Sequence, residues 1–515
     1  MQANPITRRD ALAWLAAAGV GSAWPNAAVA QTPQLHGGIL RVSAPNNPST
    51  LDPATGNSGN DHVFLYTLFD TLVEWEYATL EPRPGLAASW SYPDPKTLVL
   101  ELRPGVLFHD ATACNAEAVK FNLDRHRNDA RSNTRPDLAT VAAVEVTGPL
   151  QVTLHLSQPD SALPLILSDR AGMMVSPTAI AALGKDHDRA PVGTGPWKFV
   201  SWEDNEKVVV KRNDHYWKPG LPYLDGIEFS IINEVNTGLR SVIAGQNDFV
   251  FFLSPQQKPV IDRAKNLVSV TGPTLYCVQL YLNYGRKPLN DVRVRQALNY
   301  AINRQEFNQA TANNLAEPAM LPLPEKHWAF DRSLANAYPH DPNKARQLLA
   351  EAGYPNGLDL DLLGNSDQRM VQRQEVLIEQ FAKAGIRARF TNGVVPNTTA
   401  IFFVQGQHDA YLSAWTGRPD PSLTYQLMFG KTSFYNAGRA DPVPGLAEAL
   451  LATRESSDLI ARQAAFARLE RMVSENALVV PLLFQFEMDA HSKKVKSYRP
   501  NLLGKPRFET VSLET

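Results

Sequence analysis

Cysteine is scarce in this chain of 515 residues, which has only Cys114 and Cys277. The two form no CxxC pair and no cluster with histidine, which excludes zinc fingers, iron–sulfur ferredoxins and disulfide-rich scaffolds. Whether the two thiols pair is left open by the sequence. An excess of charge is also missing, since 50 Lys and Arg face 52 Asp and Glu, a net charge of -2. We therefore expect neither nucleic acid nor an anionic membrane as a partner.

The motifs whose spacing implies a reaction are missing as well. The sequence has no GxSxG nucleophile elbow, no GxxxxGK[ST] phosphate loop, no GxGxxG dinucleotide turn and no HExxH helix. The eleven histidines are scattered, with no pair at metal-ligand spacing on one helix face. We predict a protein that is not an enzyme and that carries no metal and no cofactor.

Long apolar runs are lacking, and the N-terminal one is short. Ala11–Val20 is about half of the roughly 20 residues that a membrane-spanning helix needs. It follows the adjacent pair Arg8 and Arg9, which resembles the twin-arginine export signal. An ordinary secretory signal that happens to contain two arginines is the alternative.

A cleavage site follows this run. Ala28 and Ala30 are small residues at the two positions that a signal peptidase reads. We predict that residues 1–30 are a signal peptide cleaved before Gln31. No cysteine follows for a lipid anchor, so a free periplasmic protein is predicted.

The remainder of the chain alternates strand-like and helix-like segments without an internal repeat. Amphipathic helices are predicted after Asp291 and over Pro342–Ala352, where Asp341 can cap the free amides. Strands are predicted over the following ranges, several of which show alternation with a period of two: Ile39–Ser43, Thr97–Leu102, Gln151–Leu156, Lys207–Arg212, Gly226–Ile232 and Val278–Asn283. The pattern indicates an α/β fold, and the length implies two or more domains.

Several longer phrases carry a family resemblance. They are Thr50–Pro53, Leu68–Val73, Pro84–Trp90, Leu102–Asp110, Asn115–Phe121, Val192–Phe199, Arg212–Trp217, Val292–Ile302 and Ala345–Pro355. In this order they resemble the extracellular solute-binding proteins of family 5, which serve ATP-driven importers of peptides and related solutes. We expect most of these phrases to be scaffold, with Trp90, Trp197 and Trp217 as packing anchors.

The resemblance implies a two-lobe periplasmic-binding-protein fold of type II, with an extra subdomain in the first lobe. The expected ranges are 31–70, 188–275 and 486–515 for the core of lobe I, 71–187 for the extra subdomain and 276–485 for lobe II. A two-strand hinge is expected near Thr274–Tyr281 and Pro481–Glu487. The solute would be buried between the closing lobes of a monomer and delivered to an inner-membrane ABC permease complex.

The segment Ser413–Pro421 aligns with the place where peptide-binding relatives hold an aspartate for the peptide's α-amino group. Arg418 stands about there in this chain, which inverts the preference towards a carboxylate or another anion. Relatives with Gly-Arg followed by Asp-Pro in this segment include glutathione-type binders. Trp415 and Asp420 are further candidates, with core packing and turn initiation as their structural alternatives.

Other candidates rest on loop position. Arg369 lies near the place where peptide-binding relatives hold an arginine for the ligand carboxylate, and an ordinary surface arginine is the alternative. Asn46 and Asn47 follow the first strand, and Tyr435 and Asn436 lie in a later loop; all four could form hydrogen bonds at the opening of the cleft.

Together these observations predict a periplasmic substrate-binding protein of an ABC importer, which captures a small peptide or a peptide-like solute with a carboxylate. An exported enzyme or cofactor protein that uses the twin-arginine route is the alternative class. Within the binding class, the solute could also be an opine, an oligosaccharide, a metal chelate or haem.

Overall fold

The computed structural model describes residues 37–514 except 57, 438, 439 and 442. The predicted signal peptide, with Arg8, Arg9, Ala28 and Ala30, lies outside the described residues. Within the described part of the chain, no helix is long and apolar enough to cross a membrane.

The first sheet mixes parallel and antiparallel strands. Its order is β12 (Leu267–Gly272), β19 (Glu487–Ser492), β11 (Phe249–Leu253), β1 (Ile39–Ala44), β10 (Gly226–Ile231), β9 (Lys207–Arg212) and β8 (Trp197–Glu203). The central strand β1 is parallel to both of its neighbours, whereas β19 is antiparallel to β11 and β12. Apolar side chains of this sheet pack against α2 (His62–Leu68), α6 (Val235–Ile243) and α7 (Lys258–Arg263).

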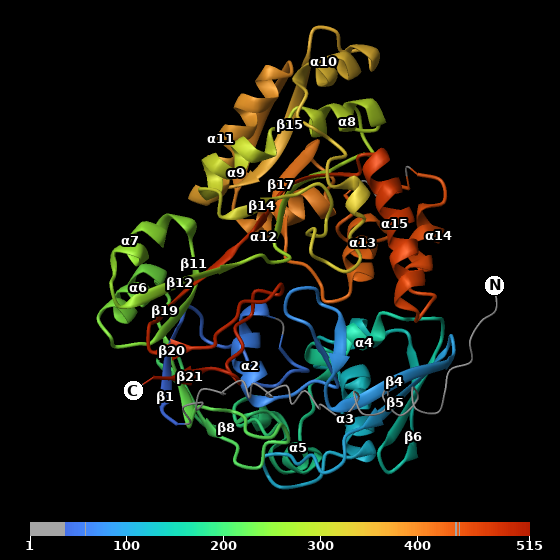
Figure 1. Cartoon of the computed structure of the whole chain (residues 1–515). Coiled ribbons are helices and arrows are strands. Elements are labelled where there is room, and N and C mark those ends of the chain that lie inside the picture. Colours follow the sequence, from blue (N-terminus) through green and yellow to red (C-terminus); the bar gives the residue numbers. More distant parts are fainter. Residues whose placement is uncertain (1–36, 57, 438–439, 442, 515) are drawn as a thin grey trace, which may run out of the picture. The chain divides into compact units, whose positions relative to one another are not determined.

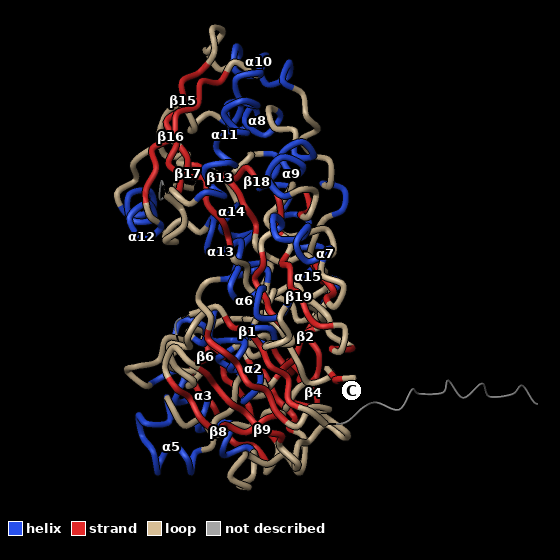
Figure 2. The backbone as a smooth tube through the Cα atoms, turned by 90° about the vertical axis from the view of Figure 1, so that its left-hand side faces the viewer, coloured by secondary structure: helices blue, strands red, loops and turns tan. Residues whose placement is uncertain are grey.

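The second sheet is built from the later part of the chain. Its order is β14 (Ala316–Pro318), β18 (Val479–Gln485), β13 (Cys277–Leu282), β17 (Ala410–Trp415), β15 (Leu358–Asn365) and β16 (Ile386–Gly393). All of these strands except β14 are labelled in Figure 2. Its helices are α8 (Val292–Tyr300), α9 (Arg304–Ala312), α10 (Pro342–Glu351), α11 (Gln368–Lys383), α12 (Val395–Thr399), α13 (Pro421–Phe429), α14 (Leu446–Ala452) and α15 (Leu459–Glu475). One apolar core joins this sheet to most of these helices.

A third sheet is antiparallel, in the order β4 (Ala87–Asp94), β5 (Thr97–Leu102), β7 (Gln151–Leu156) and β6 (Val141–Gly148). Its neighbours along the chain are α3 (Ala116–Asn128), α4 (Leu163–Ile166) and α5 (Pro177–Leu183). Two small ribbons pair β2 (Val73–Trp75) with β3 (Pro82–Pro84) and β20 (Val495–Lys496) with β21 (Ser512–Leu513). Cys114 and Cys277 are both free and buried, and they lie in different apolar cores.

The chain passes twice between the first and second sheets. One passage links β12 to β13, and the other links β18 to β19 through Phe486 (Figure 1). The passages run side by side, because Gln485 N donates to Tyr276 O at 2.9 Å and Thr274 Oγ1 donates to Gln485 O at 2.7 Å. The α/β fold and the predicted strands are confirmed, with ends that differ by at most one residue.

The two predicted helices begin directly after the aspartates that cap them. Asp341 Oδ1 accepts from Lys344 N at 2.8 Å at the start of α10, and Asp291 caps α8 in the same way. A side-chain acceptor at this position satisfies an amide that lacks a partner inside the helix. The apolar stripe of α8, with Val294, Ala297 and Leu298, is fully buried.

Three of the phrases that carry the family resemblance contact one another. Asp70 is buried and accepts hydrogen bonds from Tyr216 Oη at 2.8 Å and from Trp217 Nε1 at 2.7 Å. Gly193 leaves no room for a side chain, since a Cβ there would lie 2.1 Å from Leu68 O. These contacts hold three distant phrases together, as expected of packing anchors.

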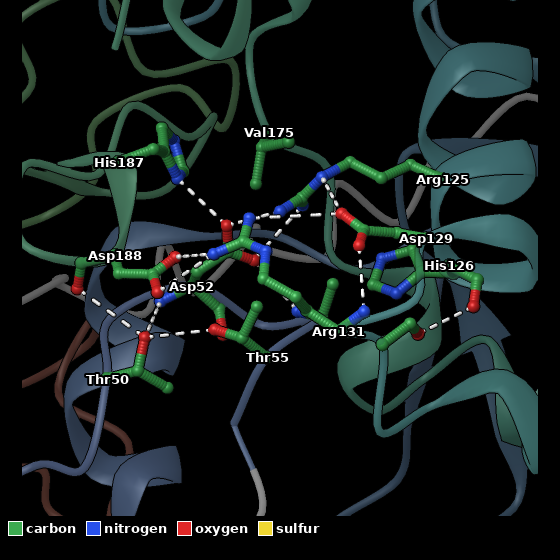
Figure 3. A network of polar contacts seen from close by, with 12 residues as sticks. Thr50, Asp52, Thr55, Arg125, His126, Asp129, Arg131, Val175, His187 and Asp188 are labelled. Atoms are coloured by element: carbon green, nitrogen blue, oxygen red, sulfur yellow. Dashed lines mark hydrogen bonds and ion pairs between the residues drawn. The ribbon is translucent and has the colours of Figure 1, made fainter. Parts of the chain in front are cut away.

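A buried polar network fixes the loop after β1 (Figure 3). Asp52 is fully buried and accepts from Arg125 Nη1 at 3.1 Å and Nη2 at 2.5 Å. His187 Nδ1 lies 3.3 Å from Asp52 Oδ2, and Ala54 N donates to Asp52 Oδ1 at 2.9 Å. The network ties this loop to α3, beside the third sheet.

Glu470 on α15 is a buried carboxyl whose ionisation the fold opposes. Tyr425 Oη and Asp331 N both donate to it at 2.6 Å, but burial dominates and raises its pKa from 4.5 to about 8. A group whose pKa is raised in the folded state contributes its full stabilisation at a pH below its pKa in the unfolded chain. This contribution is lost as the pH rises through the pKa of the folded state. Stability should therefore fall between pH 5 and 8, by at most about 1.4 kcal/mol per pH unit from this group.

Glu470→Gln is expected to flatten this fall, because the amide carries no proton to lose. Urea unfolding at several pH values between 5 and 8 measures the effect. Glu475→Gln, at an exposed position of the same helix, is the matched control and should leave the slope unchanged. An unaltered slope in Glu470→Gln would contradict the raised pKa.

Candidate functional site

Arg418 lies in the loop between β17 and α13, and its side chain is half-buried. Its Nη1 donates to Gly417 O at 2.7 Å, and its guanidinium carbon lies 5.0 Å from the centre of the Trp415 ring. It forms no ion pair with a carboxylate of the described residues. A structural ion pair, the alternative role for Arg418, is therefore not found within the described residues.

Arg170 and Lys505 approach the same place from other parts of the chain, and we call these three residues the cationic cluster. Both are half-buried, and neither forms an ion pair within the described residues. Arg170 Nη1 is buried without a hydrogen-bond partner there. Burial, with Arg170 and Arg418 nearby, lowers the pKa of Lys505 to about 8, although Asp169 and Glu487 oppose this.

Backbone contacts explain why these segments converge. Gly417 has a φ of +78°, and a Cβ there would lie 2.2 Å from Leu275 Cβ, so the loop packs directly against the β12–β13 passage. Leu275 N donates to Leu502 O at 2.8 Å, and Asn501 Nδ2 donates to Lys505 O at 2.8 Å. The C-terminal segment is thereby fixed beside the Arg418 loop.

Three acidic groups, Asp169, Asp137 and Glu487, lie near the cationic cluster. His62 Nε2 is 2.5 Å from Asp169 Oδ1. His62 and Lys505 outweigh burial and hold the pKa of Asp169 well below its usual range. Asp137 is exposed and close enough to feel the charges of Arg170 and Arg418. Burial, with Asp489 nearby, raises the pKa of Glu487 well above its usual range. Among the described residues, Arg170 Nη1 has no hydrogen-bond partner.

A cavity of about 1170 Å³ lies at the end of β17. Ser413 and Thr416 at the end of β17 line it, together with Tyr276 and Gln485 from the two passages and Ser254 after β11. Residues from both sheets thus contribute to one cavity. Arg369 and Arg373 of α11 line it as well; Arg369 is exposed and Arg373 is buried.

Three predicted residues have side chains that other contacts occupy. Asp420 is fully buried, caps α13 through Ser422 N at 2.9 Å, and accepts from Arg462 Nη2 at 3.0 and 2.9 Å. Asn47 Oδ1 accepts from Trp202 Nε1 at 3.1 Å and from Asn205 N at 3.0 Å. Asn436 is buried, and its Nδ2 donates to Ala440 O at 2.9 Å, whereas its Oδ1 has no partner among the described residues. These geometries favour structural roles.

The remaining candidates are placed differently. Trp415 is buried, donates from Nε1 to Thr424 Oγ1 at 3.1 Å, and packs edge-on against Tyr435 at 5.2 Å. Asn46 is half-buried, and its side chain forms no hydrogen bond with the described residues. Trp415 therefore joins Arg418 and Tyr435 in one aromatic and cationic group, while Asn46 contacts neither.

A buried ion pair also joins the surroundings of the second and third sheets. Arg454, after α14, donates from Nε to Asp160 Oδ1 at 2.9 Å and from Nη2 to Oδ2 at 2.5 Å. Ser161 N donates to Arg454 O at 2.9 Å. The segment after α14 and the segment after β7 are therefore in direct contact through this ion pair and this hydrogen bond.

Arg170, Arg373 and Lys505 were not among the residues predicted from the sequence. A signal existed for Arg373, because it falls on the buried stripe of α11 with Met370 and Leu377. A charged residue on such a stripe is unusual unless it is paired. Arg170 and Lys505 had no comparable signal, since each is a single cation in a loop-like segment.

This arrangement, with mixed sheets linked by two passages and a solute-sized cavity beside them, is that of a two-lobe solute-binding protein. Residues 81–436 match the model of the bacterial extracellular solute-binding proteins, family 5. The chain is 30% identical to the glutathione-binding protein GsiB of Salmonella typhi over 502 residues, which cover 94% of this chain and 95% of that protein. The chain therefore belongs to the extracellular solute-binding proteins of family 5.

Solved structures agree on the fold. HbpA2 from Haemophilus parasuis superposes with a TM-score of 0.83 at 23% identity, covering 93% of this chain and all of that chain. The periplasmic binding protein DppA from Helicobacter pylori, in complex with the peptide STSA, superposes with a TM-score of 0.75 at 24% identity. The match covers 93% of this chain and 99% of that chain. Proteins of this family bind solutes rather than convert them, so this chain is a binding protein and not an enzyme.

Proposed function

We propose that this chain is the periplasmic substrate-binding protein of an ABC importer and that it captures a small peptide or a peptide-like solute through a carboxylate. Residues 1–30 would direct export and be removed. The mature protein would act as a monomer and deliver its solute to an inner-membrane permease complex. The glutathione-binding relative supports a peptide-like solute for this chain.

The observation that carries the proposal is the unpaired state of Arg418. A half-buried guanidinium without an internal carboxylate is suited to an anion from outside, because its planar donors match a carboxylate in a bidentate way. Arg170 and Lys505 add positive charge at the same place. An α-ammonium group would be repelled there, which separates this site from one built for a peptide's amino end.

We propose lobes with the ranges given above, 31–70, 188–275 and 486–515 for lobe I, 71–187 for its extra subdomain and 276–485 for lobe II. The β12–β13 and β18–β19 passages would form the hinge. Opening about them would separate Arg454 from Asp160, so this ion pair belongs to the closed form. The cavity between Ser254 and Thr416 would then open to receive solute.

Native mass spectrometry of the gently purified mature protein, followed by a thermal-shift screen, tests the function. We expect a bound or added carboxylate peptide to raise the unfolding temperature, since a ligand at 100 times its Kd stabilises by about 2.7 kcal/mol. Glutathione and Gly-Leu serve as probes, and maltotriose and haemin as the competing solute classes. A shift with maltotriose or haemin and none with the peptides would refute the proposal.

A further inference from the structure

Glu487 is a carboxyl at the junction of the two passages for which the described residues supply no partner. It begins β19 directly after Phe486, and its half-buried side chain forms no hydrogen bond or ion pair with the described residues. A Cβ added at Gly504 would lie 2.1 Å from Glu487 Oε2 and 3.1 Å from Thr274 Cγ2. The carboxyl therefore packs against the backbone of the C-terminal segment, beside the β12–β13 passage.

Few charges face Glu487. The adjacent strands β11 and β12 contain no titratable residue. Lys505 of the C-terminal segment favours the ionised form of Glu487, whereas burial and the charge of Asp489 favour the neutral form and outweigh it. Burial also raises the pKa of Asp489 to about 7, although Tyr498 Oη donates to Asp489 Oδ2 at 2.5 Å. The two carboxyls are two residues apart on β19, so their titrations are linked.

Opening of the hinge would change the surroundings of Glu487. The Arg418 loop packs on the β12–β13 passage, because a Cβ at Gly417 would lie 2.2 Å from Leu275 Cβ. Leu275 N in turn donates to Leu502 O in the C-terminal segment. A rotation that moved the Arg418 loop away from this segment would admit water to the half-buried carboxyl, and water favours the ionised form of a carboxyl.

We propose that Glu487 couples lobe closure to proton uptake, because it is ionised in the open form and protonated in the closed form. This inference rests on the hinge of the proposed function and deepens it by adding a regulation of the same site. Between the pKa of the open form and that of the closed form, closure takes up one proton. The closure constant should therefore fall by up to about tenfold per pH unit as the pH rises.

Small-angle X-ray scattering of the solute-free mature protein between pH 5 and 8 tests the coupling without a ligand. We expect a smaller radius of gyration at pH 5 than at pH 8. Glu487→Gln imitates the protonated form and should keep the smaller radius throughout. Glu206→Gln, at an exposed position between β8 and β9, is the matched control and should respond to pH as the wild type does. A wild-type radius that does not change with pH, or a change that survives in folded Glu487→Gln, would overturn the inference.

Titration calorimetry with glutathione and Gly-Leu, in two buffers of different ionisation enthalpy, counts the protons taken up on binding. Between pH 5 and 7 we expect uptake of up to one proton by the wild type and of almost none by Glu487→Gln. Lys505 could also take up a proton when an anion binds, but only near its own pKa of about 8. If a peptide binds without proton uptake, the inference fails and the proposed function stands. If the radius responds to pH as expected but neither peptide binds, the proposed function fails and the inference stands.

Discussion

Asp52→Asn should destabilise the fold by about 3 to 5 kcal/mol, the cost of leaving a buried charge without its partner. Asp52 is fully buried and is the carboxylate that Arg125 meets with both of its terminal nitrogens. The substitution keeps the size of the side chain but leaves the Arg125 charge uncompensated. Denaturant unfolding of the two proteins at neutral pH measures the difference.

The control for this effect is an aspartate in an exposed ion pair. Asp262 accepts from Lys258 at 2.8 Å on the surface of α7, and Asp262→Asn should cost about 1 kcal/mol or less. The hydrogen bonds from His187 and Arg125 outweigh burial and hold the pKa of Asp52 well below 3.8. The contribution of Asp52 to stability is therefore fully present above about pH 3.8, the usual pKa of the group, and it is lost as the pH falls through the lower pKa of the folded state. A loss no larger than that of Asp262→Asn would contradict this account.

Arg418→Ala should weaken solute binding by about 2 to 5 kcal/mol, the range for truncating one partner of a desolvated charge pair. Calorimetry with the tightest peptide of the thermal-shift screen gives the dissociation constant. Arg418→Lys should recover part of the loss, because lysine keeps the charge but lacks the planar fork of donors. The control is Arg471→Ala, because Arg471 is exposed and forms an ion pair with Asp331 at 3.3 Å. An unchanged dissociation constant in a folded Arg418→Ala protein would remove Arg418 from the site.

The parts of the fold that depend on local patterns were predictable. The helix α10 follows from an aspartate cap, a proline at the first position and an apolar stripe, all of which are adjacent in sequence. Arg418 could be singled out because a guanidinium between glycine and proline fits no regular element. Side-chain partners were not predictable, since Asp420 finds Arg462 and Asn47 finds Trp202 only after distant segments pack.

Arg373 shows the limit of a pattern-based analysis of the site. Helical periodicity marks its position as buried, but its partner Gln485 lies on a strand of the other passage, far away in sequence. Lys505 comes close to Arg418 because Gly417 packs against Leu275 and Leu275 N donates to Leu502 O. Arg170 reaches the same place from a third distant segment. Contacts between residues that are distant in sequence cannot be predicted from local composition, because they form only when the chain packs into its tertiary structure.

The pairing of β19 with both β11 and β12 has a consequence for the order of folding. The whole second sheet separates β12 from β19 along the chain, so forming this pair must close a very long loop. Closure entropy grows with loop length, and it falls if the intervening chain has already become compact. We therefore expect the β13–β18 region to form early and β19 to enter the first sheet late. Until then β11 and β12 present unpaired edges, which are the segments most exposed to intermolecular pairing during folding.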